Sequence, residues 1–482
     1  MSEPFYTHYW LPCKQDLKDK ADSLEVRITT SLPNKVGSNG VLYAIDTLPN
    51  HKIKYHWKST YPIDYYLISI AVAPYWSYEM HTKPMYGKRI SILNYLYPDS
   101  VHFASAKQAI DCTRLQMNML RNCFGEYPFA NEKYGHCIAP MSGGMEHQTM
   151  TTMTGFSFDL SVHEMAHQWF GDNVTCATWG DIWLNEGFAT YAQYLARAYF
   201  ENKAAADAFM KAVHGRAMRE AEGSVYVPSE FWNHRDRIFS GNLSYYKGAA
   251  VIHQIRFVLD NDSLFFEVLK RYQQTYAHGV ASTEDFKSIL QDLSDRDWDT
   301  YFAQWVYGRG YPLYSIEWEQ TDDYQIIISS KQKSSSQETT FFTMPYHLRM
   351  IYSNGKDTLI RVQQNQPEET WQIQLSQEVE AIEANPYNHM LMKVLHKPQR
   401  KQPAVVLFPN PVQEVLHLAF TNAMLNRYYY LYTIDMKLLQ TGKAENERIN
   451  INVKHLPQGV YLLQIKNTRQ TANQKVYKFV KI

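Results

Sequence analysis

The spacing of hydrophobic residues along the chain changes from strand-like to helical and back again. Within residues 1–85, short runs rich in Val, Ile, Tyr and Trp are typical of β-strands. The dipeptide Asn39-Gly40 predicts a hairpin turn in this part, because both residue types tolerate the positive φ of tight turns. The strands expected here are residues 23–30, 53–57 and 66–73.

Residues 86–312 change to helical spacing. An amphipathic helix is expected at residues 103–123, where apolar residues recur with the helical period. Residues 282–285, which read S-T-E-D, resemble a capping box ahead of another apolar run. This part of the chain therefore predicts a mostly helical domain.

Residues 313–395 return to strand-like alternation. The dipeptide Asn354-Gly355 predicts a second hairpin, and no motif with chemistry occurs here, so a packing domain is the simplest interpretation. The expected strands include residues 324–329 and 347–352.

The end of the chain divides into a joint and a small module. Residues 396–404 are polar, basic and contain proline, which is typical of a linker. Residues 405–482 contain short strand-like runs between turn residues and predict a β-sandwich module. The whole pattern predicts a multidomain α+β protein, in which a mostly helical domain at 86–312 is flanked by β-sandwich-type domains, including 1–85 and 313–395.

Length and charge narrow the possible classes. The chain has 482 residues, which suits about three domains. Lys plus Arg and Asp plus Glu both number 48, and this balance argues against general nucleic-acid binding. No stretch of about 18 apolar residues occurs, so no transmembrane segment is expected. The five cysteines form no CxxC pair, which argues against a zinc ribbon, and we expect them to be buried and unpaired.

Candidate chemistry begins at residues 163–167, which read H-E-M-A-H. Apolar neighbours in helical rhythm predict a helix here, and Gly171 is expected to end it. Side chains four residues apart on a helix lie one above the other, so the two imidazoles can hold one divalent metal. Glu164 lies about 100° further round the helix, where its carboxylate can take a proton from water near that metal.

A catalytic zinc usually has three protein ligands and one open position. Glu186 follows His167 after eighteen intervening residues, inside a second helical run expected at about 181–200. That distance is enough to end one helix, turn, and bring the next helix back beside it. His163, His167 and Glu186 would then form a set of nitrogen and oxygen donors that suits zinc. Taken alone, the five-residue motif also fits a surface helix with two solvated histidines.

Two further clusters flank this helix in the sequence. Residues 143–147 read G-G-M-E-H, where two glycines allow a close approach of the backbone and Glu146 supplies a negative charge. Residues 245–248 read Y-Y-K-G, and the hydroxyl of Tyr245 can donate a hydrogen bond to an oxyanion. In isolation, the first cluster fits a turn with a solvated glutamate and the second fits ordinary aromatic packing.

Together and in this order, the three clusters resemble the zinc aminopeptidases of the aminopeptidase N and leukotriene hydrolase family, over about residues 1–395. That family carries Gly-(Ala/Gly)-Met-Glu-(Asn/His), then HExxH, eighteen residues, a Glu, and then Tyr-x-Lys-Gly. The resemblance implies a thermolysin-like, mostly helical catalytic domain after an N-terminal β domain. This chain departs from many relatives in having His147 where they have Asn, and residues 1–85 look like only the later part of that β domain.

The resemblance also implies a cofactor and catalytic roles. His163, His167 and Glu186 would hold one zinc ion per chain. Glu164 would activate the attacking water as general base. Tyr245 would stabilise the negative charge that develops on the substrate carbonyl.

Substrate contacts follow from the same resemblance. Glu146 would bind the free α-ammonium of a peptide, and Glu3 falls where the family has a second carboxylate for that amine. So close to the start of the chain, Glu3 could equally be a frayed, solvated residue. The backbone of Gly143, Gly144 and Met145 would line the bound substrate.

The end of the chain resembles the C-terminal sorting domain that type IX secretion recognises in some Gram-negative bacteria. Residues 408–411 (F-P-N-P), residues 459–461 (G-V-Y) and the basic end carry this resemblance. It implies a secreted or outer-membrane surface protein with the secretion machinery as a partner. Because residues 1–17 lack the features of a signal peptide, we expect residue 1 to be an internal methionine of a longer protein.

The sequence therefore predicts a zinc-dependent aminopeptidase that acts on peptides with a free N-terminus. Two alternatives stay open at this point. A thermolysin-like endopeptidase would also cut peptides whose amine is blocked. A non-catalytic cell-surface binding protein could use the same fold without hydrolysis.

Overall fold

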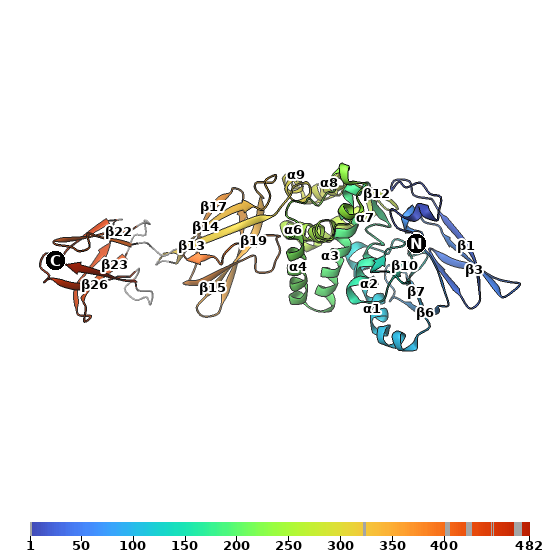
Figure 1. The fold of residues 1–482 in the computed structure, drawn as a ribbon, viewed down its shortest axis with the longest axis horizontal. Helices are drawn as coiled ribbons and strands as arrows, with labels where there is room; N and C mark the ends of the chain where they lie inside the picture. The colour runs from blue at the N-terminus through green and yellow to red at the C-terminus, as the bar shows by residue number, and fades with distance from the viewer. Residues whose placement is uncertain are drawn as a thin grey trace. The chain divides into compact units, whose positions relative to one another are not determined.

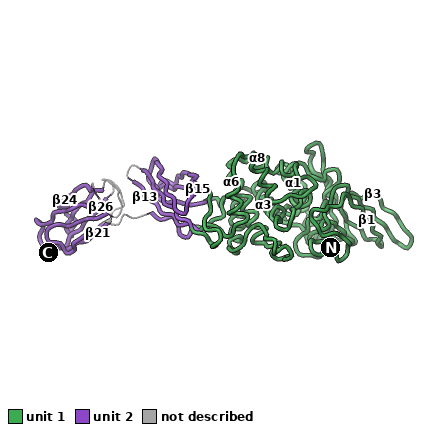
Figure 2. The backbone as a smooth tube through the Cα atoms, turned by 90° about the horizontal axis from the view of Figure 1, so that it is seen from above, with its two compact units in different colours: residues 1–312, 333–345, 387–393 green, residues 313–332, 346–386, 394–482 purple. Residues whose placement is uncertain are grey.

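The structure is a computed structural model, and it describes residues 2–321, 324–400, 405–420, 427–444, 446, 448–466 and 475–482. The chain forms two compact units (Figure 2). Unit 1 comprises residues 1–312, 333–345 and 387–393, and unit 2 comprises 313–332, 346–386 and 394–482. Sheets come first along the chain, helices dominate the middle and sheets return, which confirms the predicted α+β class (Figure 1).

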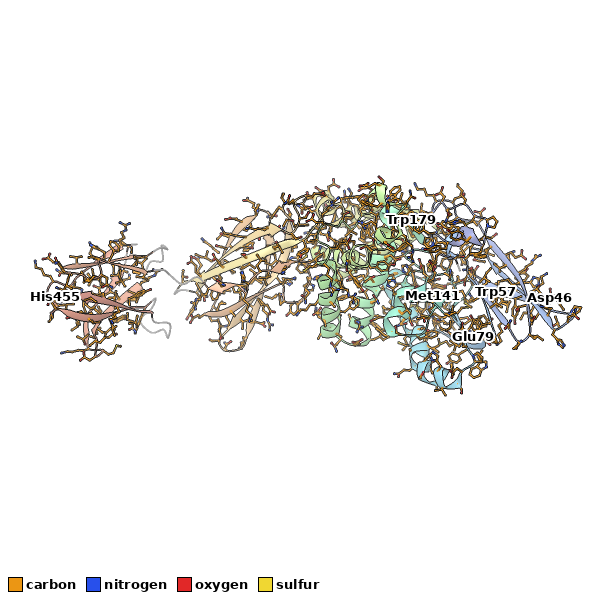
Figure 3. All side chains as sticks on the ribbon, in the orientation of Figure 1. Asp46, Trp57, Glu79, Met141, Trp179 and His455 are labelled. Atoms are coloured by element: carbon orange, nitrogen blue, oxygen red, sulfur yellow. The ribbon has the colours of Figure 1, made fainter. Side chains whose placement is uncertain are left out.

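Unit 1 begins with two small antiparallel sheets. Trp57, which is labelled in Figure 3, forms part of their core. Its side chain is buried, and its Nε1 donates a hydrogen bond to the carbonyl of Val36 at 3.0 Å. The strands of the first sheet, in spatial order, are β1 (Leu24–Ser31), β4 (Lys52–Ser59) and β3 (Val41–Leu48). The second sheet pairs β2 (Lys35–Ser38) with β5 (Ile70–Ala73).

The hairpin predicted at Asn39-Gly40 is wrong. These residues connect β2 to β3, which pair with β5 and β4 respectively and not with each other. The side chain of Asn39 is instead buried, where its amide donates to the carbonyls of Leu67 and Gln148. Gly40 has a φ of 74°, and a Cβ there would stand 2.0 Å from the carbonyl oxygen of Lys58. The dipeptide thus forms the connection between strands of two different sheets.

The strand predicted at residues 66–73 is also shorter than expected. Residues Tyr65–Leu67 form one turn of 3-10 helix, and β5 includes only Ile70–Ala73. Asp64 caps this turn by accepting a hydrogen bond from the backbone N–H of Tyr65 at 3.0 Å. Residues 63–69 are buried without interruption, and an apolar run of this kind does not distinguish a short helix from a strand by its pattern.

A five-stranded sheet supports the middle of unit 1, in the order β6-β7-β8-β10-β9. β7 and β8 are parallel, as are β8 and β10, whereas β9 pairs antiparallel with β10 at the edge. Its strands are β6 (Trp76–His81), β7 (Ser91–Leu96), β8 (Tyr134–Ile138), β9 (Gly144–Met145) and β10 (Thr151–Met153). β11 (Val174–Cys176) and β12 (Gly279–Ala281) form a separate parallel pair.

Helices occupy most of the chain from residue 100 to residue 302. The amphipathic helix expected at 103–123 is confirmed as α1, and the capping box is confirmed at the start of α8, where Ser282 and Asp285 bond each other's backbone. The helices are α1 (Ser100–Phe124), α2 (Phe158–Ala166), α3 (Trp183–Phe200), α4 (Lys203–Ala217), α5 (Arg235–Ile238), α6 (Gly248–Leu259), α7 (Asp262–Thr275), α8 (Thr283–Ser294) and α9 (Asp299–Phe302).

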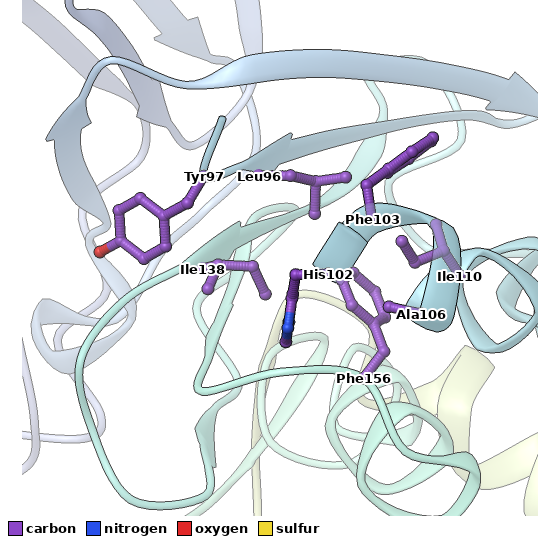
Figure 4. Close-up of a pocket in the computed structure, with 8 residues that line it drawn as sticks. All are labelled: Leu96, Tyr97, His102, Phe103, Ala106, Ile110, Ile138 and Phe156. Carbon is purple, nitrogen blue, oxygen red and sulfur yellow. The ribbon is translucent and has the colours of Figure 1, made fainter. Parts of the chain in front are cut away.

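An apolar pocket lies between the first turns of α1 and the end of β7 (Figure 4). Its lining residues are mostly aromatic and aliphatic: Leu96, Tyr97, His102, Phe103, Ala106, Ile110, Ile138 and Phe156. None of the site residues predicted from the sequence lines it, so this pocket is separate from the predicted chemistry.

Unit 2 consists of β-sheets in its described residues. The hairpin predicted at Asn354-Gly355 is confirmed: it joins β15 to β16, Gly355 has a φ of 77°, and its N–H donates to the carbonyl of Tyr352 at 3.0 Å. One sheet contains β17 (Glu368–Gln374), β14 (Gln325–Ser334), β13 (Pro312–Gln320), β19 (Lys393–Val394) and β20 (Gln399–Arg400). The other contains β16 (Asp357–Gln364), β15 (Met344–Tyr352) and β18 (Val379–Ala384).

The C-terminal module has two sheets around one apolar core, which includes Leu418, Leu431, Leu463 and Phe479. One sheet contains β21 (Val405–Phe408), β22 (Val415–Phe420) and β25 (Arg448–Asn452). The other contains β24 (Leu438–Ala444), β23 (Arg427–Thr433), β26 (Gly459–Lys466) and β27 (Lys475–Lys481). Residues 401–404 of the predicted linker lie outside the described residues, and the predicted domain boundaries stay a prediction.

Two compositional expectations also have outcomes. All five cysteines are unpaired; Cys137 and Cys176 are buried, and Cys13, Cys112 and Cys123 are half-buried. Among the described residues, no helix combines the length and the apolarity that a membrane crossing requires.

Candidate metal centre

Helix α2 carries the two histidines of the motif. Ser157 caps its start by accepting a hydrogen bond from the backbone N–H of Leu160 at 3.2 Å. The helix ends at Ala166, before the stop predicted at Gly171, and Gly171 lies in the turn that follows, with a φ of 139°. His167 keeps helical angles as the C-terminal cap (φ −58°, ψ −25°), so its side chain still lies on the face that carries His163.

Three side-chain atoms converge where the sequence predicts a metal. His163 Nε2 and His167 Nε2 are 3.3 Å apart, and Glu186 Oε2 lies 3.5 Å from the first and 3.3 Å from the second. A tetrahedral zinc with ligand bonds of about 2.0–2.2 Å separates its ligand atoms by roughly 3.3–3.6 Å. The triangle therefore has the size that a zinc ion with one open corner requires.

The residues around this triangle fix the orientation of one imidazole and the ionisation of the carboxylate. His167 Nδ1 lies 3.0 Å from the carbonyl oxygen of Phe170, an arrangement that keeps a proton on Nδ1 and makes Nε2 the nitrogen that would coordinate a metal. Glu186 Oε2 is buried and receives no hydrogen bond from the described residues. Burial alone would raise the pKa of Glu186, but the charges and close polar contacts of His167 and His163 together outweigh it, and the pKa is lowered to about 2. An ionised carboxylate is the form that binds metal.

Glu164, which follows His163 directly, lies against Gly144 of the first cluster. A Cβ on Gly144 would stand 2.5 Å from the carboxyl carbon of Glu164, so only glycine fits beside it. Burial raises the pKa of Glu164 to about 8; the positive charge of His167 opposes this shift, and the negative charges of Glu146 and Glu186 add to it. The close approach predicted from the two glycines is made by Gly144 to Glu164, whereas a Cβ on Gly143 would meet nothing within 4 Å.

Glu146 follows β9 directly and is buried. Burial raises its pKa, the charge of His167 opposes that shift, and the negative charges of Glu186 and Glu3 add to it. Glu3 therefore lies within electrostatic reach of Glu146. The neighbouring His147 connects the segment after β9 to the start of the chain, because its Nε2 lies 3.1 Å from the carbonyl oxygen of Ser2.

Tyr245 lies in a π-helical segment, Gly241–Lys247, that runs directly into α6. Its ring is nearly parallel to that of His163, with an interplanar angle of 9° and centroids 6.0 Å apart. Burial raises the pKa of Tyr245 well above its ordinary value, followed by the negative charge of Glu186. The phenol is therefore protonated at neutral pH and able to donate a hydrogen bond.

Two glycines set the distance between the helices that carry Tyr245 and Glu186. A Cβ on Gly187 would stand 3.1 Å from the Cα of Gly248, so α3 and α6 approach backbone to backbone at this point. Gly187 directly follows Glu186, and Gly248 comes three residues after Tyr245. This crossing brings the third cluster to the metal triangle.

Gln168 is a site residue that the sequence reasoning missed. Its Nε2 donates to the carbonyl of Glu146 at 3.1 Å, and its Oε1 accepts from the backbone N–H of Thr149 at 2.8 Å. The side chain is fully buried, so these bonds fix the turn that carries Glu146. Its only signal in the sequence is a polar side chain in the apolar run after His167.

The six predicted side chains other than Glu3 thus meet in one region of unit 1. A ligand set of two imidazoles and one ionised carboxylate, with a second carboxyl group and a phenol in the same region, supplies the parts needed for hydrolysis assisted by a metal. Whether Gly143, Gly144, Met145, Glu146 and Glu3 contact a substrate stays a prediction at this point.

Two family models match parts of the chain. The model of the peptidase family M1 domain matches residues 109–305. The model of the secretion system C-terminal sorting domain matches residues 406–479. The first match contains the whole metal triangle, and the second lies inside the C-terminal module.

A curated relative agrees with the first of these matches. Aminopeptidase M1-A from Oryza sativa subsp. japonica is 27% identical over 338 residues, which cover 65% of this chain and 37% of that protein. The aligned part of the chain thus spans well under half of that curated relative.

Solved structures are similar as well. A mutant of the M1 zinc metallopeptidase from Deinococcus radiodurans, bound to a Tyr-Ser-Ala substrate, has a TM-score of 0.55 at 25% identity and covers 64% of this chain and 69% of its own. Aminopeptidase A from Legionella pneumophila, in complex with aspartic acid, has a TM-score of 0.67 at 17% identity, with coverage of 79% and 46%. The latter likeness supports the fold alone.

Proposed function

We propose that this chain, which carries a peptidase family M1 domain and a secretion system C-terminal sorting domain, is a zinc-dependent aminopeptidase. Both resemblances inferred from the sequence are confirmed by the family matches. The observation that carries the proposal is the triangle of His163, His167 and Glu186, with ligand atoms 3.3–3.5 Å apart. We assign one zinc ion per chain to this triangle.

The chain's own residues divide the work of hydrolysis. When bound, zinc supplies a Lewis acid that polarises the scissile carbonyl and acidifies the attacking water. Glu164 accepts the proton of that water and returns it to the leaving amine, and its raised pKa suits a group that both takes and gives a proton near neutral pH. Tyr245 donates its hydroxyl proton in a hydrogen bond to the developing oxyanion.

The position of cleavage depends on how the substrate amine is held. Glu146 and Glu3 would together bind the free α-ammonium, because two carboxylates near each other favour a cation between them. An ammonium fixed beside the metal places the first peptide carbonyl at the reactive position. This arrangement favours removal of one residue from the N-terminus over cleavage inside a chain.

The backbone of the substrate has a suitable partner in β9. This strand is the edge of its five-stranded sheet and pairs with β10 on one side only among the described residues. An extended peptide can bind such an edge through main-chain hydrogen bonds. The backbone of Gly143, Gly144 and Met145 would line the bound peptide, with Gly143 shaping the approach through its φ of 75° while its carbonyl accepts from the N–H of Thr154 at 2.9 Å.

The sorting domain indicates export to the cell surface or the medium. We therefore propose peptides outside the cytoplasm as substrates and the secretion machinery as the partner of residues 405–482. The domain boundaries at residues 85, 312 and 395 and the linker at 396–404 belong to the same proposal.

A panel of aminoacyl-anilides with free or acetylated amines tests the function. We expect hydrolysis of free-amine substrates only, loss of activity with a chelator, and recovery with zinc. Glu164→Gln should keep the zinc but lose at least about 100-fold in kcat, since it removes the proton acceptor. Cleavage of acetylated substrates at similar rates would instead indicate an endopeptidase, and zinc binding without any hydrolysis would indicate a binding protein.

A further inference from the structure

Lys20 reaches the turn after the two histidines from a distant part of the sequence. Its Nζ donates a hydrogen bond to the backbone carbonyl of Asp172 at 2.7 Å and a longer one, at 3.4 Å, to that of Asn173. These partners are 152 and 153 residues away along the chain, and all three residues belong to unit 1. The contact connects the N-terminal part of the chain to the segment that directly follows α2.

The turn that Lys20 contacts determines how His167 is oriented. The backbone N–H of Asp172 donates to the carbonyl of His167 at 3.0 Å, which closes the turn. Inside it, the carbonyl of Phe170 faces His167 Nδ1 at 3.0 Å. A Cβ on Gly171 would stand 3.3 Å from the same nitrogen, so the turn is tightly packed against the ring. Holding Asp172 and Asn173 therefore also holds the Phe170 carbonyl in place.

Lys20 is itself held firmly enough to act as an anchor. The next residue, Ala21, forms a two-bond bridge with Ile63, and both hydrogen bonds are 2.9 Å long. Asp64 follows that bridge, and its charge acts on Lys20 together with the charge of Asp172. Burial lowers the pKa of Lys20 to about 8, so the ammonium stays protonated at neutral pH.

Two buried carboxyl groups belong to the surroundings of this ammonium: burial raises the pKa of Asp64 to about 7 and the pKa of Asp172 well above its ordinary value. Both carboxylate oxygens of Asp172 and Oδ2 of Asp64 are buried and receive no hydrogen bond from the described residues. Buried carboxyl groups without partners are costly, and a nearby ammonium offsets part of that cost. None of the catalytic or ligand roles described above uses Lys20, Asp64 or Asp172.

We infer that Lys20 is a positioning residue of the metal centre: by clamping the carbonyls of Asp172 and Asn173, it keeps the imidazole of His167 aligned for zinc. The N-terminal part of the chain thereby contributes to metal affinity as well as to substrate binding. This inference rests on the proposed zinc site, but it does not depend on which bond the enzyme cuts.

Equilibrium zinc affinity of the full chain, measured by competition with a chelator, tests the inference. Lys20→Met removes the ammonium at similar length and should weaken zinc binding about 10-fold, as is typical when the outer partner of a metal ligand is lost. Lys20→Arg keeps a positive charge and several donors, so it should retain most of the affinity. Lys14→Met is the matched control, because Lys14 is exposed and its ion-pair partners among the described residues are Asp16 and Asp19.

The outcomes separate this inference from the proposed function. A folded Lys20→Met chain with the zinc affinity of the wild type would overturn it, even if the enzyme is fully active. If Lys20→Met does not fold, the Lys20→Gln variant provides the test. Glutamine keeps one donor group without the charge, so this variant should bind zinc more weakly than Lys20→Arg. Equal affinity in the Gln and Arg variants would likewise overturn the inference. A wild-type chain that binds zinc but cleaves no peptide would contradict only the proposed function.

Discussion

Gly144 lies directly against the carboxylate of Glu164, and a Cβ on Gly144 would stand 2.5 Å from both the carboxyl carbon and Oε1. This relationship joins two motifs that are twenty residues apart in the sequence: the edge strand β9 and the helix α2. The strand proposed to bind the substrate backbone therefore also packs against the proposed general base and limits where its carboxylate can lie.

Gly144→Ala should consequently reduce turnover while leaving the metal in place. The added methyl group overlaps the carboxylate, so Glu164 has to move, and a displacement of about 1 Å costs on the order of 100-fold in kcat. Steady-state kinetics and the zinc content of the purified variant measure both effects. Gly155→Ala is the control, because a Cβ on Gly155 meets nothing within 4 Å. Unchanged kcat in Gly144→Ala would contradict the assignment of Glu164.

Tyr245→Phe should lower kcat by about 100- to 1000-fold, the usual effect of losing one oxyanion donor. Phenylalanine keeps the ring beside His163, so the zinc content should not change. Tyr246→Phe is a matched control, since the ring of Tyr246 faces the guanidinium of Arg216 at 5.2 Å. If both variants lose the same activity, the effect comes from the segment and not from the hydroxyl of Tyr245.

The crossing of α3 and α6 predicts opposite effects for two glycine substitutions. A Cβ on Gly248 would stand 3.1 Å from the Cα of Gly187, and backbone atoms cannot move aside as a side chain can. Gly248→Ala should therefore lower the free energy of unfolding by about 1–3 kcal/mol. Gly215→Ala, inside α4 where a Cβ meets open space, should raise it by about 0.5–1 kcal/mol. Urea denaturation of both variants checks the signs, and a neutral Gly248→Ala would contradict the close crossing.

The metal triangle could be predicted from the sequence because its geometry is local. The four-residue spacing of His163 and His167 fixes two imidazoles on one helix face whatever the rest of the fold does. His167 keeps helical angles although α2 ends at Ala166, so an error in the helix boundary did not change the ligand geometry. Glu186 needed only that a second helix return beside the first.

Features that depend on distant partners could not be predicted in this way. Asn39-Gly40 has the composition of a hairpin turn, but the pairing of β2 with β5 and of β3 with β4 decides what it does. The contact of Lys20 with Asp172 spans 152 residues, and no local pattern around Lys20 marks it. Gln168 directly follows the motif, yet its hydrogen bonds are made to Glu146 and Thr149, which lie about twenty residues earlier in the segment between β9 and β10.

Lys133 predicts how the stability of the chain depends on pH. Its ammonium is buried, donates to the carbonyls of Ser38 and Thr149, and lies 5.3 Å above the ring of Trp57. Burial lowers the pKa of Lys133 to about 7, below the ordinary value of 10.5. Between these values the unfolded chain binds a proton that the folded chain lacks, so raising the pH through this window favours the folded state.

Lys133→Met should remove that contribution. The wild type should gain up to about 1.4 kcal/mol of unfolding free energy per pH unit from this residue, and the variant should not. Denaturant unfolding at pH 7.5 and 9.0 measures the two slopes, and their difference cancels the groups that titrate equally in both chains. The exposed Lys211→Met serves as the control. Equal slopes in wild type and Lys133→Met would mean that the folded protein keeps this ammonium charged, held by the two carbonyls and the indole ring.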